Sequence, residues 1–91
     1  MREGIRTMAL SAKTAGLLLA GTGAAHFVAP KAFLGITVKA FPKDTQQWVY
    51  RNGATELALG LALSTAKTRK LGLLGALGYV GWLGANVVKN R

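Results

Sequence analysis

The chain alternates between long apolar segments and short basic ones. The apolar segments cover residues 9–29, 46–66 and 71–88, and each is close to the length that a helix needs to cross a hydrocarbon core of about 30 Å. Most lysines and arginines collect in four groups around these segments. Apolar spans with basic flanks are typical of membrane proteins. The pattern therefore predicts an all-α integral membrane bundle of three transmembrane helices, forming a single membrane domain over residues 1–91.

Residues 31–43 differ from the three spans. The stretch follows Pro30, which ends the first helix, and it is short, with lysines at both ends and inside. Its loosely amphipathic pattern predicts an interfacial segment between the first and second spans. An alternative interpretation of the first span as a cleaved signal peptide fits less well, because its apolar run continues past the small residues at 22–25 into His26 and Phe27.

The third span carries glycine at every third position from 72 to 84. Collagen has the same period, but this run is short and contains no proline. Glycine is tolerated in a membrane helix because the bilayer enforces backbone hydrogen bonding. Small residues also repeat at every fourth position of the second span, where they let another helix approach closely. The predicted helix-packing surface consists of Ala54, Ala58, Ala62, Gly72, Gly75, Gly78, Gly81 and Gly84.

Charge and composition narrow the possible functions. The 91 residues include twelve Lys and Arg, three Asp and Glu, one His and no Cys, for a formal net charge of +9. Without cysteine there is no disulfide or thiolate metal site, and one histidine alone cannot hold a metal. The basic residues flank apolar spans, so we expect contact with lipids; a soluble nucleic-acid binder is the weakest alternative. No nucleophile motif, carboxylate pair or phosphate loop is present, so we expect no enzyme.

The basic flanks also predict the orientation of the chain. Three spans put the N-terminus and the 67–70 turn on one side of the membrane and the 31–43 segment and the C-terminus on the other. Because the positive-inside rule places the more basic side in the cytoplasm, we expect a cytoplasmic N-terminus. The first side carries Arg2, Arg6, Lys13, Lys67, Arg69 and Lys70, and the second carries Lys31, Lys39, Lys43, Lys89 and Arg91.

Polar side chains inside the spans are the candidate functional residues, because ionisable groups at membrane depth are rare and are usually paired or functional. A rise of about 1.5 Å per residue places four of them in one layer near one membrane face and places Glu56 deeper, at a level similar to that of Tyr79. A ligand or proton site is therefore predicted at His26, Arg51, Asn52, Glu56 and Asn86.

Two interpretations of these polar residues stay open. In the functional one, His26 and Glu56 exchange protons, Arg51 supplies a counter-charge, and Tyr79 or Trp82 forms the wall of a site for a quinone or a lipid headgroup. In the structural one, the same side chains tie the helices together, with Glu56 paired to a neighbour on its own span. Beyond a quinone or a lipid, no cofactor is expected.

Several stretches together resemble the DoxX-like family of small bacterial membrane proteins. They are GTGAAHFVAPKAF at 21–33, FPKDTQQWVYRNGATELALGLAL at 41–63, TRKLG at 68–72 and the Ala-Asn-Val at 85–87. The resemblance implies a multi-pass protein of the bacterial cytoplasmic membrane, four spans of which this chain would lack the last, and, for some members, quinone-linked redox partners. On matching positions it implies sites at His26, Glu56 and Asn86.

Two functions are consistent with these features. The first is a structural or accessory subunit that docks on a larger membrane complex, such as a respiratory one, or self-associates through its small-residue helix faces. The alternative is a quinone- or lipid-binding redox helper with a polar pocket inside the membrane.

Overall fold

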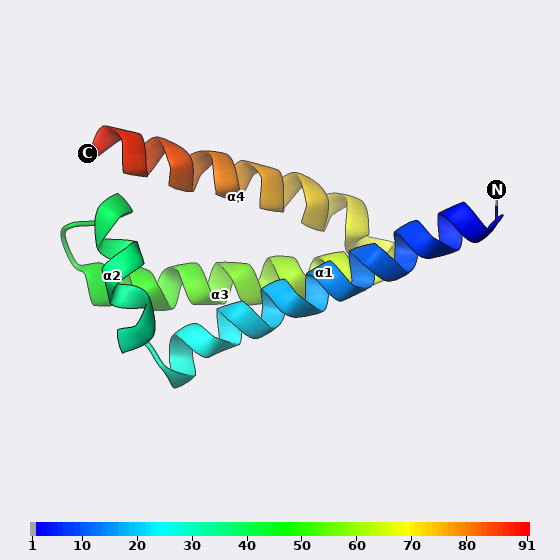
Figure 1. The fold of residues 1–91 in the computed structure, drawn as a ribbon, viewed down its shortest axis with the longest axis horizontal. Coiled ribbons are helices and arrows are strands. Elements are labelled where there is room, and N and C mark those ends of the chain that lie inside the picture. Colours follow the sequence, from blue (N-terminus) through cyan, green and yellow to red (C-terminus); the bar gives the residue numbers. More distant parts are fainter. Residues whose placement is uncertain (1) are drawn as a thin grey trace.

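The computed structural model describes residues 2–91, and these are helical almost throughout, which confirms the all-α class (Figure 1). Met1, which the predicted domain includes, lies outside the described residues. The long helices run antiparallel in sequence order, so the N-terminus and η1 lie at one end and α2 and the C-terminus at the other (Figure 1). The elements are α1 (Arg2–Val28), α2 (Lys31–Ala40), α3 (Thr45–Ser64), the short 3-10 helix η1 (Ala66–Thr68) and α4 (Arg69–Lys89).

The helices extend over the three predicted apolar spans, and α1 begins earlier than its span. Its first residues are polar but contain no proline, so nothing in them prevents the helix from continuing beyond the apolar segment. At 27 residues and about 1.5 Å each, α1 is roughly 40 Å long, which exceeds the thickness of a hydrocarbon core. The N-terminal turns of α1 therefore project past the end of α3 (Figure 1).

The closest packing in the molecule is between α1 and α3. The buried residues of this contact are small: Gly16, Ala20 and Gly23 on α1 face Gly53 and Gly60 on α3. A Cβ atom added to Gly16 would lie only 2.6 Å from the carbonyl oxygen of Gly60. The two backbones are thus in direct contact, as in small-residue contacts between membrane helices.

The close approach of α4 to α3 through glycine lies near the η1 turn. A Cβ added to Gly72 would lie 2.7 Å from the backbone nitrogen of Leu63, and one on Gly75 would lie 2.5 Å from Leu59 Cδ2. Ala62 meets Gly72 in this contact. Within residues 2–91, an added Cβ would meet no neighbouring atom within 4 Å at three later glycines of the predicted packing surface, Gly78, Gly81 and Gly84.

Two alanines of the predicted helix-packing surface, both on α3, do not take part in helix packing within the described chain. Ala54 and Ala58 are exposed. The face of α3 that meets α1 lies one or two positions away, at Gly53 and Gly60. Packing by the two alanines against another molecule therefore stays a prediction.

α2 lies across one end of the bundle. The chain bends by 106° between α1 and α2, at the position where Pro30 predicts a break. α2 contacts both α3 and α4, and its buried residues are Thr37 and Ala40. The segment predicted to be interfacial is therefore a short helix that bridges the other helices.

Among residues 2–91, one helix is long and apolar enough to cross a membrane, the continuous segment Ala66–Lys89. α1 and α2 meet the same criterion only when joined as one bent pair. We attribute the shortfall of α3 to its strongly polar residues, which are Gln46, Gln47, Arg51, Asn52 and Glu56. One of the three predicted crossings is thus supported by length and composition, and the three-span bundle stays a prediction.

Candidate functional site

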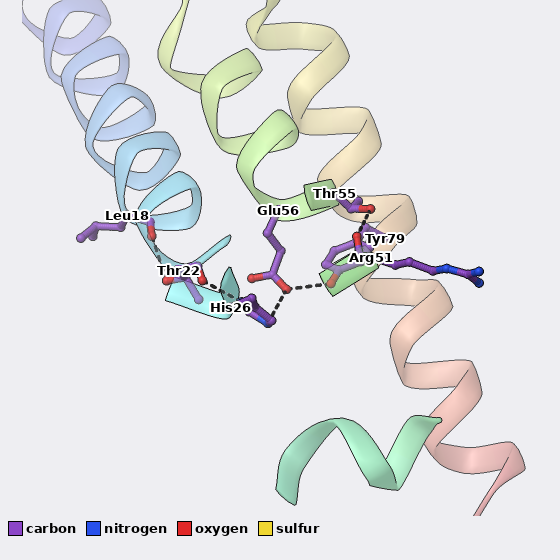
Figure 2. Close-up of polar contacts among 7 residues, drawn as sticks. All are labelled: Leu18, Thr22, His26, Arg51, Thr55, Glu56 and Tyr79. Atoms are coloured by element: carbon purple, nitrogen blue, oxygen red, sulfur yellow. Dashed lines mark hydrogen bonds and ion pairs between the residues drawn. The ribbon is translucent and has the colours of Figure 1, made fainter. Parts of the chain in front are cut away.

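Three polar side chains from three helices meet inside the bundle. The Tyr79 hydroxyl of α4 donates a hydrogen bond of 2.7 Å to Oε2 of Glu56 on α3, and Nε2 of His26 on α1 lies 3.7 Å from the same oxygen (Figure 2). The side chains of His26 and Glu56 are only 6% and 13% exposed. We call these three residues the polar cluster. It joins α1, α3 and α4 at one point.

The imidazole of His26 is fixed in place by its surroundings. Nδ1 lies 2.7 Å from the carbonyl oxygen of Thr22, one turn earlier in α1. A carbonyl oxygen can only accept, so Nδ1 carries a hydrogen and donates it. The ring of Phe33 on α2 stacks on the imidazole with a centroid separation of 3.7 Å. Gly53 makes room for His26, because a Cβ added there would lie 2.5 Å from His26 Cβ.

The polar cluster forms part of the wall of a groove of about 460 Å³, to which all four α-helices contribute. Small-molecule sites in proteins usually have volumes of about 300–1,000 Å³. Besides the polar cluster, the lining includes the polar side chains of Thr22, Thr37 and Asn52. Most of the remaining lining is apolar and is contributed by Phe33, Ile36, Phe41, Val80, Leu83 and Val87.

Three of the five predicted site residues line this groove, namely His26, Asn52 and Glu56. Arg51 does not, because it is exposed and its guanidinium carbon lies 4.9 Å from the centre of the Trp48 ring. Figure 2 shows its side chain directed away from Glu56. Successive residues of a helix point about 100° apart, which is consistent with the exposure of Arg51 beside the buried Asn52. Arg51 is therefore not placed as a counter-charge to Glu56.

Asn86 also lies away from the polar cluster. Its amide donates to the carbonyl oxygen of Trp82, one turn earlier in α4. Asn86 lines a separate cleft together with Asn90, whose amide donates to the carbonyl oxygen of Ala40. The structure therefore divides the predicted site: three of its residues line the groove, and Arg51 and Asn86 lie outside it.

The partners of Glu56 differ from those that the structural interpretation proposed. The carboxylate contacts Tyr79 and His26, on two other helices, and not a neighbour on α3. Sequence reasoning placed Tyr79 at the depth of Glu56 but assigned it as a wall, so its role as a hydrogen-bond donor was missed. Thr37 was also missed, because no periodicity signal fixes how α2 is turned.

An aromatic cluster stands at the end of the groove next to α2. Phe41 stacks on Trp48 with a centroid separation of 4.3 Å, and both rings contact Trp82, at 5.2 and 5.6 Å. These contacts attach the segment after α2 to α3 and α4. Because Phe41 also lines the groove, the aromatic cluster bounds the site on this side.

Comparison with known proteins gives one match. A family model described as "Domain of unknown function (DUF8561)" matches residues 15–90. The matched range contains the polar cluster and the whole lining of the groove. No curated protein and no solved structure matches the chain.

Proposed function

We propose that the chain, which belongs to the DUF8561 family of domains of unknown function, is a small multi-pass membrane protein that binds an amphipathic, lipid-soluble molecule in its groove. One observation carries the proposal: a buried polar cluster is set into a groove that is otherwise largely apolar. Sites for such ligands combine apolar walls with a few well-placed polar groups. The walls would hold a ring or tail, and the polar cluster would hold the headgroup.

The distribution of apolar side chains supports a membrane location. Nineteen large apolar side chains of residues 2–91 are exposed, and five apolar residues are buried. A water-soluble protein of this size would bury most of its large apolar side chains, whereas lipid tails would cover them here. The polar residues Asn52 and Glu56 of α3 face the groove, so α3 can serve as the second span, with Arg51 as its one outward-directed charged residue near its end.

The arrangement of the helix ends supports the proposed topology. The N-terminus and η1 share one end of the molecule, as two cytoplasmic segments would (Figure 1). The basic residues near this end outnumber those at the other end by one, which favours a cytoplasmic N-terminus. The resemblance to DoxX-like proteins adds the bacterial cytoplasmic membrane as the location and favours a quinone, in its oxidised or reduced form, and thus a redox helper, over other lipids.

Purification in a mild detergent tests the proposal directly. We expect organic extracts of the wild-type protein to contain one lipid-soluble molecule in near-stoichiometric amount, identified by mass spectrometry. Glu56→Gln should lower its amount about tenfold, because losing a hydrogen bond to a charged group weakens binding by about 1.5–3 kcal/mol. Glu3→Gln, which removes an exposed carboxylate outside the groove, should leave it unchanged. Wild-type extracts without an enriched molecule would refute the proposal.

A second function, docking as an accessory subunit, is favoured by a different observation. Gly78, Gly81 and Gly84 on α4 have room beside them, and the large apolar residues around them, such as Leu77 and Val80, are exposed. A larger membrane complex, such as a respiratory one, or a second copy of the chain could pack a helix against this glycine-containing face of α4. This face of α4 adjoins the groove, because Val80 and Gly84 also line the groove, so a helix docked on it would lie beside the ligand site.

Docking through α4 predicts a specific loss of copurification. Gly78→Leu and Gly81→Leu should each remove the larger membrane proteins that copurify with the wild-type chain, because leucine fills the space that the partner helix needs. Quantitative mass spectrometry of tagged preparations measures the effect. Gly21→Leu is the matched control, because Gly21 is also an exposed helical glycine with an open Cβ position. Equal copurification in all four proteins would contradict docking through α4.

A further inference from the structure

The hydrogen-bonding groups that face the groove determine which headgroup fits it. Building on the proposed function, we infer that the groove selects a neutral headgroup with hydroxyl donors, such as a hydroquinone or a lipid alcohol, over the matching carbonyl compound and over an anionic headgroup. The inference rests on which polar atoms of four residues already form hydrogen bonds and which do not. The four residues are His26, Glu56, Asn52 and Thr37.

The orientation of His26 makes its free nitrogen an acceptor. Nδ1 donates its hydrogen to the carbonyl oxygen of Thr22, at 2.7 Å. In the neutral imidazole the other nitrogen then carries a lone pair. Nε2, which lies on the side of Glu56 at 3.7 Å from Oε2, is too far from that oxygen for a good hydrogen bond. It can therefore accept a hydrogen bond from a ligand hydroxyl.

Glu56 offers a second acceptor. Oε2 already receives the Tyr79 hydroxyl at 2.7 Å, and within residues 2–91 no donor forms a hydrogen bond to Oε1. Glu56 is partly exposed and lines the groove. A carboxylate has about four lone-pair positions, so most of its accepting capacity is unused. A hydroxyl donor in the groove would fill it.

Asn52 and Thr37 are the adaptable members of the site. Each is only 6% exposed and lines the groove, and neither side chain forms a hydrogen bond within the described chain. No fully buried side-chain nitrogen or oxygen of residues 2–91 lacks a partner, so their polar atoms must keep their accessible surface on the groove. Amides and hydroxyls both donate and accept hydrogen bonds, so each of these two residues can act as donor or as acceptor toward a ligand hydroxyl.

No cationic side chain offsets these acceptors. The lining of the groove includes no Lys or Arg, and Arg51 is directed away from it (Figure 2). A fatty-acid or phosphate headgroup would bring a negative charge next to Glu56 without a counter-charge. A carbonyl-only headgroup, such as a quinone, would oppose its oxygens to Nε2 and Oε1. A headgroup with hydroxyl donors satisfies both acceptors at once.

Two matched ligand pairs test the inference on the purified full-length chain in lipid nanodiscs. The first is a short-chain ubiquinol with its ubiquinone, kept under argon, and the second is monoolein with methyl oleate; oleate is the anionic probe. Titration calorimetry should give at least tenfold tighter binding for the hydroxyl member of the pair that binds, because a site built for a donor rejects the analogue that lacks it. The pair that binds identifies the source of the hydroxyl headgroup. Oleate should bind more weakly than either hydroxyl compound.

Two variants test whether the Glu56 carboxylate, as a hydrogen-bond acceptor, causes the preference for hydroxyl ligands. Glu56→Gln can present a donor amide, so it should reduce the preference for the hydroxyl member to within about threefold. Tyr79→Phe leaves the carboxylate in place and should retain the preference. Equal binding of both members of a pair by the wild type, or a preference unaffected by Glu56→Gln, would overturn the inference while the proposed function stands. Binding of no probe at all would overturn both.

Discussion

Replacing Gly60 with leucine is expected to detach α1 from α3. A Cβ atom at this position would collide with the backbone nitrogen of Ala20 and the carbonyl oxygen of Gly16, and neither backbone atom can rotate away as a side chain can. Overpacking a core ordinarily costs about 1–3 kcal/mol, and a collision with two backbone atoms should reach or exceed the upper end. Unfolding in mixed micelles with increasing dodecyl sulfate, followed by circular dichroism, measures the loss of stability.

Matched glycines serve as controls for this substitution. Gly21→Leu changes an exposed position of α1 with no neighbouring atom within 4 Å, so its unfolding midpoint should stay near that of the wild type. Gly60→Ala adds only the Cβ atom and should lie between the wild type and Gly60→Leu. A Gly60→Leu protein with a wild-type midpoint would show that α1 and α3 do not pack through this contact. Detachment should also abolish ligand binding, because it would carry His26 away from Glu56.

The positions of the elements along the chain were predictable, because apolar length, proline and basic turns act locally. The apolar runs correspond to α1, α3 and α4, and the break at Pro30 separates α1 from α2. The depth of a residue in the bundle was also predictable, because it equals the number of residues to the end of its span multiplied by a fixed rise per residue. This count placed Glu56 and Tyr79 at one level, and the structure joins them by a hydrogen bond.

The direction in which a side chain points around its helix was not predictable in this way. Arg51 and Asn52 have nearly the same depth, yet one is exposed and the other is buried on the groove. Similarly, the predicted alanines Ala54 and Ala58 lie one or two positions from the glycines of α3 that meet α1. A helix in lipid can present apolar residues on every side, so hydrophobic periodicity does not indicate the packed face. The smallest residues indicate it better, because only they allow backbones to touch.

Removing His26 alone is expected to destabilise the protein more than removing the entire polar cluster. His26→Leu replaces the polar neighbour of the Glu56 carboxylate with an apolar side chain in a largely apolar groove. Taking polar surroundings away from a buried charged group costs about 1–3 kcal/mol or more. In the triple variant His26→Leu, Glu56→Leu, Tyr79→Phe, no member of the polar cluster is left unpaired. Replacing a whole buried polar group by apolar residues of similar size is often neutral or stabilising. Midpoints of dodecyl sulfate unfolding for both variants and the wild type measure the difference.

The comparison separates the two interpretations of the polar cluster. If the cluster only ties the helices together, the triple variant should be less stable than His26→Leu, because it loses every polar contact among α1, α3 and α4. If the cluster is retained for binding, the triple variant should fold at least as well as the wild type and yet lose its ligand. The second result is the one we expect, because Glu56 and Asn52 keep hydrogen-bonding capacity that the described chain leaves unused. A cluster that served only to hold the helices together would fill that capacity within the fold, since each polar group left unpaired weakens it.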